Sequence, residues 1–260
     1  MKKNSRYIII IVILIVYLLT MYILVGKKNL RAEKVTTKLV IGDDTVWELK
    51  KKHWTSITQD SDLVKLNWTL FHVFDDGKDL GELYLWRNDD TWYLFDKDKK
   101  AINHDGRLLA YQSNYGLKIK KHKVENVIDY NEVAGFLQEK NISSTDQFSV
   151  ANYVQIDIDN DGVDEIIYLF SNALISENAP DEVFTLVFMR DDGKNYILYE
   201  THENNYGFNG CKPYVNYVLD LNDDNNYEMI LSCGRYSDLG VIDMLLEFKN
   251  GKFNNLVTNQ

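Results

Sequence analysis

Alternating oxygen-bearing residues mark one short stretch of the chain, between two apolar runs. The candidate ligands stand at positions one, three, five, seven and nine of a loop: Asp157, Asp159, Asp161, the carbonyl of Val163, and Glu165. A hard divalent cation takes six to eight oxygens at about 2.3–2.6 Å, and alternate residues of a tight loop can point at one ion. Gly162 stands where this loop must turn, and we expect a positive φ there because glycine has no Cβ. The spacing therefore predicts a calcium site.

An EF-hand loop begins with the same residues but ends differently. Its bidentate glutamate stands at position twelve, and a helix follows it. Here the acid stands at position nine, and the next residues, Ile166–Phe170, are β-branched and aromatic, which predicts a strand. The expected order is therefore strand, acidic loop and strand.

A second copy of this frame begins 63 residues later. Its candidate ligands are Asp220, Asn222, Asp224, the carbonyl of Asn226, and Glu228. Asn225 stands in place of the glycine, and asparagine visits the left-handed region more readily than most residues. One carboxylate has become an amide, so we expect this second calcium site to be the weaker one. Acidic turns also occur simply because Asp, Asn and Gly turn well and stay solvated, and that alternative stays open for both loops.

Taken together, the two frames resemble the calcium loops of the FG-GAP repeat family, which are VCBS-like repeats of the integrin α-propeller type, over residues of about 150–255. The resemblance implies blades of a β-propeller kind, a structural Ca²⁺, and a role in adhesion or recognition. A full propeller of this family needs about seven blades. This chain is too short to supply them.

Composition indicates a globular chain with a strongly acidic surface. The 260 residues are 45% hydrophobic and 13% aromatic, and the formal net charge is −10. Without residues 1–34 the remainder carries 22 basic against 38 acidic residues, a net charge of −16. Such a surface disfavours nucleic acid and anionic lipid as partners, and it suits cations.

The N-terminus predicts a membrane anchor. A basic tail at residues 1–7 precedes the uncharged segment 8–25, and residues 26–42 read as a juxtamembrane linker. Eighteen helical residues span about 27 Å, which is close to the thickness of the hydrocarbon core. A cleaved signal peptide is the alternative, although its apolar region is usually shorter. We expect a single-pass signal anchor with the bulk of the chain outside the cytoplasm, and the residue usage is typical of bacteria.

The remaining chain predicts a mainly β fold, built from meanders or propeller-blade-like hairpins, with one or two short helices. Residues 43–128 are expected to form a small β or α+β domain with a short helix near Asp43–Trp54 and a strand at Val64–Phe74. Residues 129–260 are expected to hold the two repeats, preceded by an amphipathic helix at Asn131–Lys140 capped by Asp129 or Asn131. A further hairpin follows each acidic hairpin, as a four-stranded blade requires.

The two cysteines, Cys211 and Cys233, invite a disulfide outside the cell. In a simple hairpin they are not directly opposite, so the sequence leaves their pairing open. No familiar catalytic motif is found, and the five histidines are scattered. The leading hypothesis is a membrane-anchored, calcium-binding β module that binds a protein or glycan at the cell surface without catalysis. The alternatives are a tethered glycan or cell-wall hydrolase or its accessory, and an extracytoplasmic ligand sensor.

Overall fold

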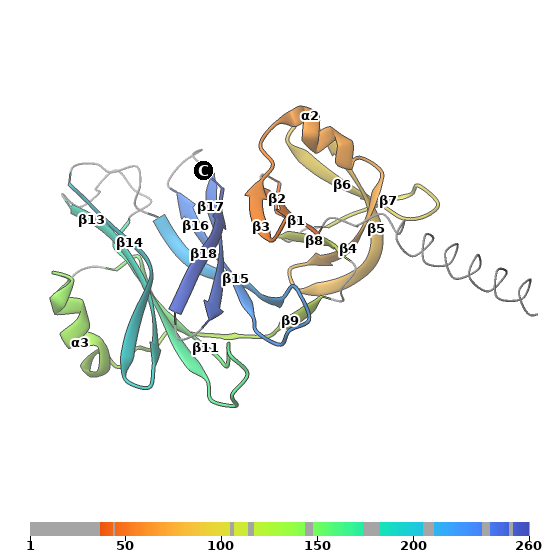
Figure 1. The fold of residues 1–260 in the computed structure, drawn as a ribbon. Coiled ribbons are helices and arrows are strands. Elements are labelled where there is room, and N and C mark those ends of the chain that lie inside the picture. Colours follow the sequence, from red (N-terminus) through yellow and green to blue (C-terminus); the bar gives the residue numbers. More distant parts are fainter. Residues whose placement is uncertain are drawn as a thin grey trace, which may run out of the picture. The chain divides into compact units, whose positions relative to one another are not determined.

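The computed structural model describes residues 37–43, 45–104, 107–113, 117–143, 148–173, 182–204, 211–235, 240–249 and 252–259 (Figure 1). Residues 1–36 and residues 37–260 are separate units, and the larger unit is compact. The predicted transmembrane segment 8–25 lies outside the described residues. Within the described ranges, no helix is long and apolar enough to cross a membrane. These ranges form three antiparallel sheets and two short α-helices, so the predicted mainly β class is confirmed.

The eight-stranded sheet has the strand order β3-β2-β1-β8-β4-β5-β6-β7 within the described residues. Its strands are β1 (Lys38–Ile41), β2 (Thr45–Lys50), β3 (His53–Ser56), β4 (Thr69–Asp75), β5 (Lys78–Asn88), β6 (Thr91–Phe95), β7 (Ala101–Ile102) and β8 (Leu108–Gln112). The short helix α2 (Asp60–Leu63) and the 3₁₀ turn η1 (Val64–Leu66) precede β4. Leu63 and Leu66 lie three residues apart and bury against this sheet.

Two five-stranded sheets contain the predicted repeats, counted over the described part of the chain. The first has the order β10-β11-β12-β13-β14, and the second has the order β18-β17-β16-β15-β9. The first consists of β10 (Lys123–Glu125), β11 (Val150–Ile156), β12 (Glu165–Ser171), β13 (Glu182–Asp191) and β14 (Lys194–Asn204). The second consists of β9 (Lys118–Lys120), β15 (Cys211–Asp220), β16 (Glu228–Arg235), β17 (Val241–Lys249) and β18 (Lys252–Thr258). Each sheet is thus a four-stranded meander with one short extra strand at its edge.

Alternating side chains bury both faces of each five-stranded sheet. On β12, Ile167 and Leu169 pack against β15–β17 of the other sheet, while Tyr168 and Phe170 face the helix α3 (Tyr130–Glu139). On β16, Met229 and Leu231 face the first sheet, and Ile230 faces the eight-stranded sheet. A strand buried on both faces reads as a continuous apolar run, as these do in the sequence.

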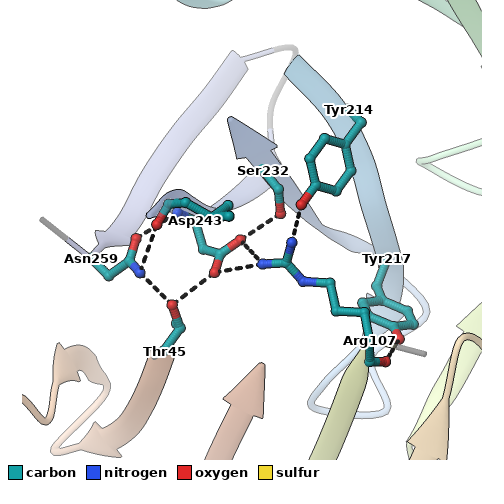
Figure 2. Close-up of polar contacts among 8 residues, drawn as sticks. Thr45, Arg107, Tyr214, Tyr217, Ser232, Asp243 and Asn259 are labelled. Carbon is teal, nitrogen blue, oxygen red and sulfur yellow. Dashed lines mark hydrogen bonds and ion pairs between the residues drawn. The ribbon is translucent and has the colours of Figure 1, made fainter. Parts of the chain in front are cut away.

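A buried polar cluster joins the eight-stranded sheet to the second five-stranded sheet (Figure 2). Asp243 on β17 pairs with Arg107 at 2.7 Å and accepts a 2.7 Å hydrogen bond from Thr45 on β2. Arg107 also donates to the hydroxyl of Tyr214 on β15. Because a buried carboxylate is costly without partners, these bonds fix how the two sheets pack.

Several predicted elements differ from the observed ones. The helix expected near Asp43–Trp54 is wrong: the segment forms β2 and β3, joined by Lys51 and Lys52, both with positive φ. Its apparent helical spacing was misleading because the consecutive residues Val46 and Trp47 are both buried, in different hydrophobic clusters, as a strand with two covered faces requires.

The strand expected from Val64 begins at Thr69, because residues 60–66 form α2 and η1. The last part of the expected linker contains β1, whose Leu39–Ile41 is buried. Strands β9 and β10 precede residue 129, and they pair with β15 and β11 of the two five-stranded sheets. The helix expected at Asn131–Lys140 is confirmed as α3, and the Asp129 side chain caps it by accepting from the amide of Asn131.

Candidate metal centre

The two acidic loops have the same backbone conformation. The first connects β11 to β12 and the second connects β15 to β16. Positive φ occurs at Asn160 and Gly162 in the first loop, and at Asp223 and Asn225 in the second. The left-handed conformation expected at Gly162 is confirmed with φ of 90°, and Asn225 adopts the equivalent conformation with φ of 64°. The glycine of one loop and the asparagine of the other therefore both supply a residue with positive φ at the same position of the loop.

Three hydrogen bonds also repeat at the same positions. The closing glutamate accepts from the amide of the second loop residue: Glu165 from Ile158 at 2.7 Å, and Glu228 from Leu221 at 3.1 Å. The residues at positions three and five each accept from the amide two residues on: Asp159 from Asp161, Asp161 from Val163, Asn222 from Asp224, and Asp224 from Asn226. These bonds hold side-chain oxygens on the inside of each loop before any ion binds.

The first loop brings three of its predicted ligands together. One carboxylate oxygen from each of Asp157, Asp159 and Glu165 lies within 4.8 Å of the others. Asp161 is outside this group, and its Oδ1 is engaged by the amide of Val163. A side-chain oxygen of Asp157, Oδ1, is buried without a hydrogen-bond partner among the described residues. Since buried oxygens are seldom left unpaired, this atom fits a cation ligand.

Burial makes the closing glutamates reluctant to ionise. It raises the pKa of Glu165 to about 7, with the negative charge of Asp159 adding to the effect. It raises the pKa of Glu228 to about 8, with Asp224 and Glu247 contributing. A divalent cation beside such a group favours its charged form. The oxygens and the electrostatics of the first loop therefore suit a hard cation.

The second loop arranges its oxygens differently. Asp220 is completely buried, and its two carboxylate oxygens accept from the amides of Asp224 and Asn225, both at 3.2 Å. The ammonium of Lys118 lies 3.3 Å from Asp220 and 2.6 Å from Asp223. In the described part of the chain, the second loop offers no three carboxylates as close together as those of the first.

Lysines near both loops were missed by the sequence analysis. Lys118 and Lys120 stand two residues apart on β9, and each reaches the first aspartate of one loop. The Lys120 ammonium lies 3.2 Å from Asp157 and also donates to its backbone carbonyl. No local sequence motif predicts these contacts, because β9 reaches the loops only by pairing with β15, a strand far away in the sequence. The alternating lysines of the segment Lys118–Lys120 were the available signal.

The cysteines flanking the second loop form a disulfide, with 5.3 Å between their Cα atoms. Strand pairing places Cys211 opposite Arg235 and Cys233 opposite Pro213, so the bridge runs diagonally. A β-bulge between Val215 and Tyr217 shifts the register of this hairpin. The pairing that the sequence left open is thereby resolved.

Comparisons with known protein families, with curated proteins and with solved structures find no match for this chain.

Proposed function

We propose that this chain is a calcium-stabilised, non-catalytic binding module that is held at a membrane by residues 8–25 and works outside the cytoplasm. The observation that carries the proposal is the group formed by Asp157, Asp159 and Glu165, together with the buried, unpartnered Oδ1 of Asp157. Carboxylate and carbonyl oxygens are the ligands that calcium prefers. Asp161 and the carbonyl of Val163 complete the proposed set, and solvent supplies the remaining oxygens.

When bound, calcium supplies positive charge that offsets the repulsion between the converging carboxylates. The residues on either side then act structurally. Asp157 directly follows β11 and Glu165 begins β12, so a shared ion joins the two strands at their open end. Because that geometry exists only in the folded chain, the binding free energy adds to the free energy of unfolding. Lys120 pairs with the other oxygen of Asp157, Oδ2, so its positive charge lies close to the proposed ion and opposes its binding.

The second loop is proposed as a weaker site with the ligands Asp220, Asn222, Asp224, the carbonyl of Asn226, and Glu228. Calcium there competes with Lys118, which already neutralises Asp220. At the affinities of extracellular calcium modules, about 10⁻⁴–10⁻³ M, both loops fill only where calcium is near millimolar.

Two further observations support a location outside the cytoplasm and a recognition role. The disulfide between Cys211 and Cys233 is the kind of bond that persists in oxidising compartments. The two sheets that carry the loops share an apolar core, and Asp159 and Asp161 of the first loop are exposed, so a protein or glycan partner at the cell surface has access to this loop.

The test is thermal unfolding of the full chain in detergent, with 2–5 mM calcium or with EGTA. That choice brackets about 10⁻³ M, the weak limit for such sites. Calcium is expected to raise the melting temperature, and Asp159→Ala/Glu165→Ala is expected to abolish that rise. The matched control is Glu82→Ala/Asp98→Ala, which removes the same charge from exposed positions and should keep the response. A melting temperature that ignores calcium would refute the structural role of the ion.

A further inference from the structure

A second feature lies away from the acidic group, where the eight-stranded sheet approaches β15. The turn between β4 and β5, the end of β9 and the middle of β15 enclose an open cleft of about 740 Å³. Ligand sites in proteins commonly have volumes of about 300–1,000 Å³. The cleft is therefore large enough for a ligand of the size of one or two sugar rings.

One wall of the cleft contains a buried donor with no acceptor. Asn216 lines the cleft, and its Nδ2 is buried without a hydrogen-bond partner among the described residues. Asn216 is the extra residue of the β-bulge between Val215 and Tyr217, where β15 interrupts its pairing with β16. A buried amide donor without an acceptor costs stability, so a bulge that keeps one beside a cleft suggests that a ligand oxygen completes it.

The charges around the cleft leave a surplus of cations. Of its four Lys and Arg residues, Arg107 is paired with Asp243 and Lys120 with Asp157. Lys78 and Lys121 are exposed, and neither has a carboxylate partner among the described residues, whereas Asp76 is the acid in the lining. Burial lowers the pKa of His122, which also lines the cleft, and so disfavours the positively charged form of this side chain. The chain has a net charge of −10, so a cleft with more unpaired cations than acids differs from the acidic character of the chain as a whole.

The walls are held rigidly by aromatic residues. Tyr214 and Tyr217 both project from β15, Tyr214 toward the guanidinium end and Tyr217 toward the backbone end of Arg107 (Figure 2). Arg107 donates to the Tyr214 hydroxyl, and the Tyr217 hydroxyl donates to the Arg107 carbonyl at 2.8 Å. Their positions are fixed before a ligand arrives, which lowers the entropic cost of binding.

We propose that this cleft binds an anionic, sugar-sized ligand that carries a carboxylate or a phosphate group. The anion lies between the ammonium groups of Lys78 and Lys121. The Asn216 side chain turns toward the cleft on binding, so that its Nδ2 donates to an oxygen of the ligand. The body of the ligand rests against Tyr214. The proposed anion contacts use none of the calcium ligands, although Lys120 lies between the cleft and Asp157 of the first loop, and the ligand chemistry of the cleft is opposite to that of the loops.

The test is titration calorimetry of the full chain in detergent with EGTA present, so that the result does not depend on calcium. The probes are glucuronate, glucose 6-phosphate and, as the neutral arm, glucose. Both charged probes, or one of them, should bind, and glucose should bind at least about tenfold more weakly, a difference of about 1.4 kcal/mol. Comparison of the first two probes shows whether carboxylate or phosphate is preferred.

Two variants locate the binding. Lys78→Ala/Lys121→Ala should weaken the preferred probe by about tenfold or more, as should Asn216→Asp, which places a negative charge where the ligand oxygen is expected. Lys97→Ala/Lys100→Ala removes two exposed lysines elsewhere and should leave the affinity unchanged. Melting temperatures near that of the parent chain would show that Lys78→Ala/Lys121→Ala folds. Binding that ignores charge, binding unaffected by either cleft variant, or no binding of either charged probe would overturn the proposal.

Discussion

The two acidic loops share one backbone and differ in what neutralises them. In the first, Asp157 keeps one buried oxygen without a partner, and three carboxylates converge within 4.8 Å. In the second, both oxygens of Asp220 are bonded to loop amides, and Lys118 bridges Asp220 and Asp223. The same frame of residues can thus present a carboxylate oxygen that is free to bind a cation, or carboxylate oxygens that are already hydrogen-bonded within the loop. Part of the difference is in the sequence, because Asn222 stands where the first loop has Asp159, so the second loop lacks one of the three converging carboxylates. The rest comes from the loop amides that bond both oxygens of Asp220, since β9 brings a lysine to the first aspartate of each loop.

The two repeats also differ at the far ends of their hairpins. Positions 63 residues before Cys211 and Cys233 hold Phe148 and Phe170. These two rings lie 5.3 Å apart between centroids in the first repeat. A covalent bridge in the second repeat therefore stands where an aromatic contact stands in the first. The second hairpin has a disulfide at one end and the Lys118–Asp220 ion pair at its loop, so we expect its stability to depend little on an ion. The first hairpin has only the aromatic contact in place of the disulfide, so we expect its stability to depend more on an ion in its loop.

The largest expected effect concerns the disulfide between Cys211 and Cys233, which the first repeat lacks. Cys211→Ala/Cys233→Ala should lower the free energy of unfolding by about 2–4 kcal/mol, because the bridge limits the unfolded chain. Chemical denaturation of the parent chain with and without reductant gives the reference. Equal stability of the parent chain and the double variant under oxidising conditions would show that the bridge contributes nothing to the second repeat.

The next effect separates a structural aspartate from a metal ligand. Asp220→Ala should cost about 1–3 kcal/mol with or without calcium, since it leaves the loop amide of Asn225 without its acceptor. Asp157→Ala should cost less in EGTA and should remove the stabilisation that calcium provides. Denaturation of both variants in calcium and in EGTA measures the four values. If the two variants respond alike to calcium, the contrast between the loops is wrong.

A smaller effect tests the role of the lysines on β9. Lys118→Met removes the tethered ammonium from the second loop and should strengthen calcium binding at that loop by about tenfold, as measured by titration calorimetry. Lys120→Met should strengthen binding at the first loop by about tenfold, because a positive charge a few ångströms from the ion opposes it. The exposed Lys97→Met is the control. If Lys118→Met binds no calcium more tightly at the second loop than the parent chain does, the second loop is not a calcium site limited by Lys118.

The sequence predicted what depends on local pattern. The strands beside each acidic loop, the cap of α3 by Asp129, and the left-handed turns at Gly162 and Asn225 all follow from residue types at fixed spacing. The segment at Thr45–Ser56 was missed because its periodicity suits a helix until tertiary packing buries Val46 and Trp47 in different clusters. Tertiary context overrides a weak local preference in this way.

The surroundings of the site could not be predicted for a related reason. Lys118 and Lys120 reach the loops only because β9 pairs with β15, about 100 residues further along the chain. The same holds for Arg107, whose partner Asp243 lies 136 residues away. Long-range pairing decides which charges meet, and a frame of alternating acids contains no information about it.

The smallest expected effect concerns the one position at which the two frames differ in backbone freedom. A Cβ added at Gly162 would meet nothing within 4 Å, so Gly162→Ala is penalised by its φ of 90° and not by a clash. The expected cost is about 1 kcal/mol, and Asn225→Gly should change the stability by less than about 0.5 kcal/mol because asparagine already tolerates φ of 64°. Denaturation in EGTA isolates this backbone cost. Under the proposed function, the ion requires the same loop conformation, and Gly162→Ala should then also weaken calcium binding by a similar factor. A variant that loses stability but binds calcium as tightly as the parent chain would show that the ion does not need the left-handed turn.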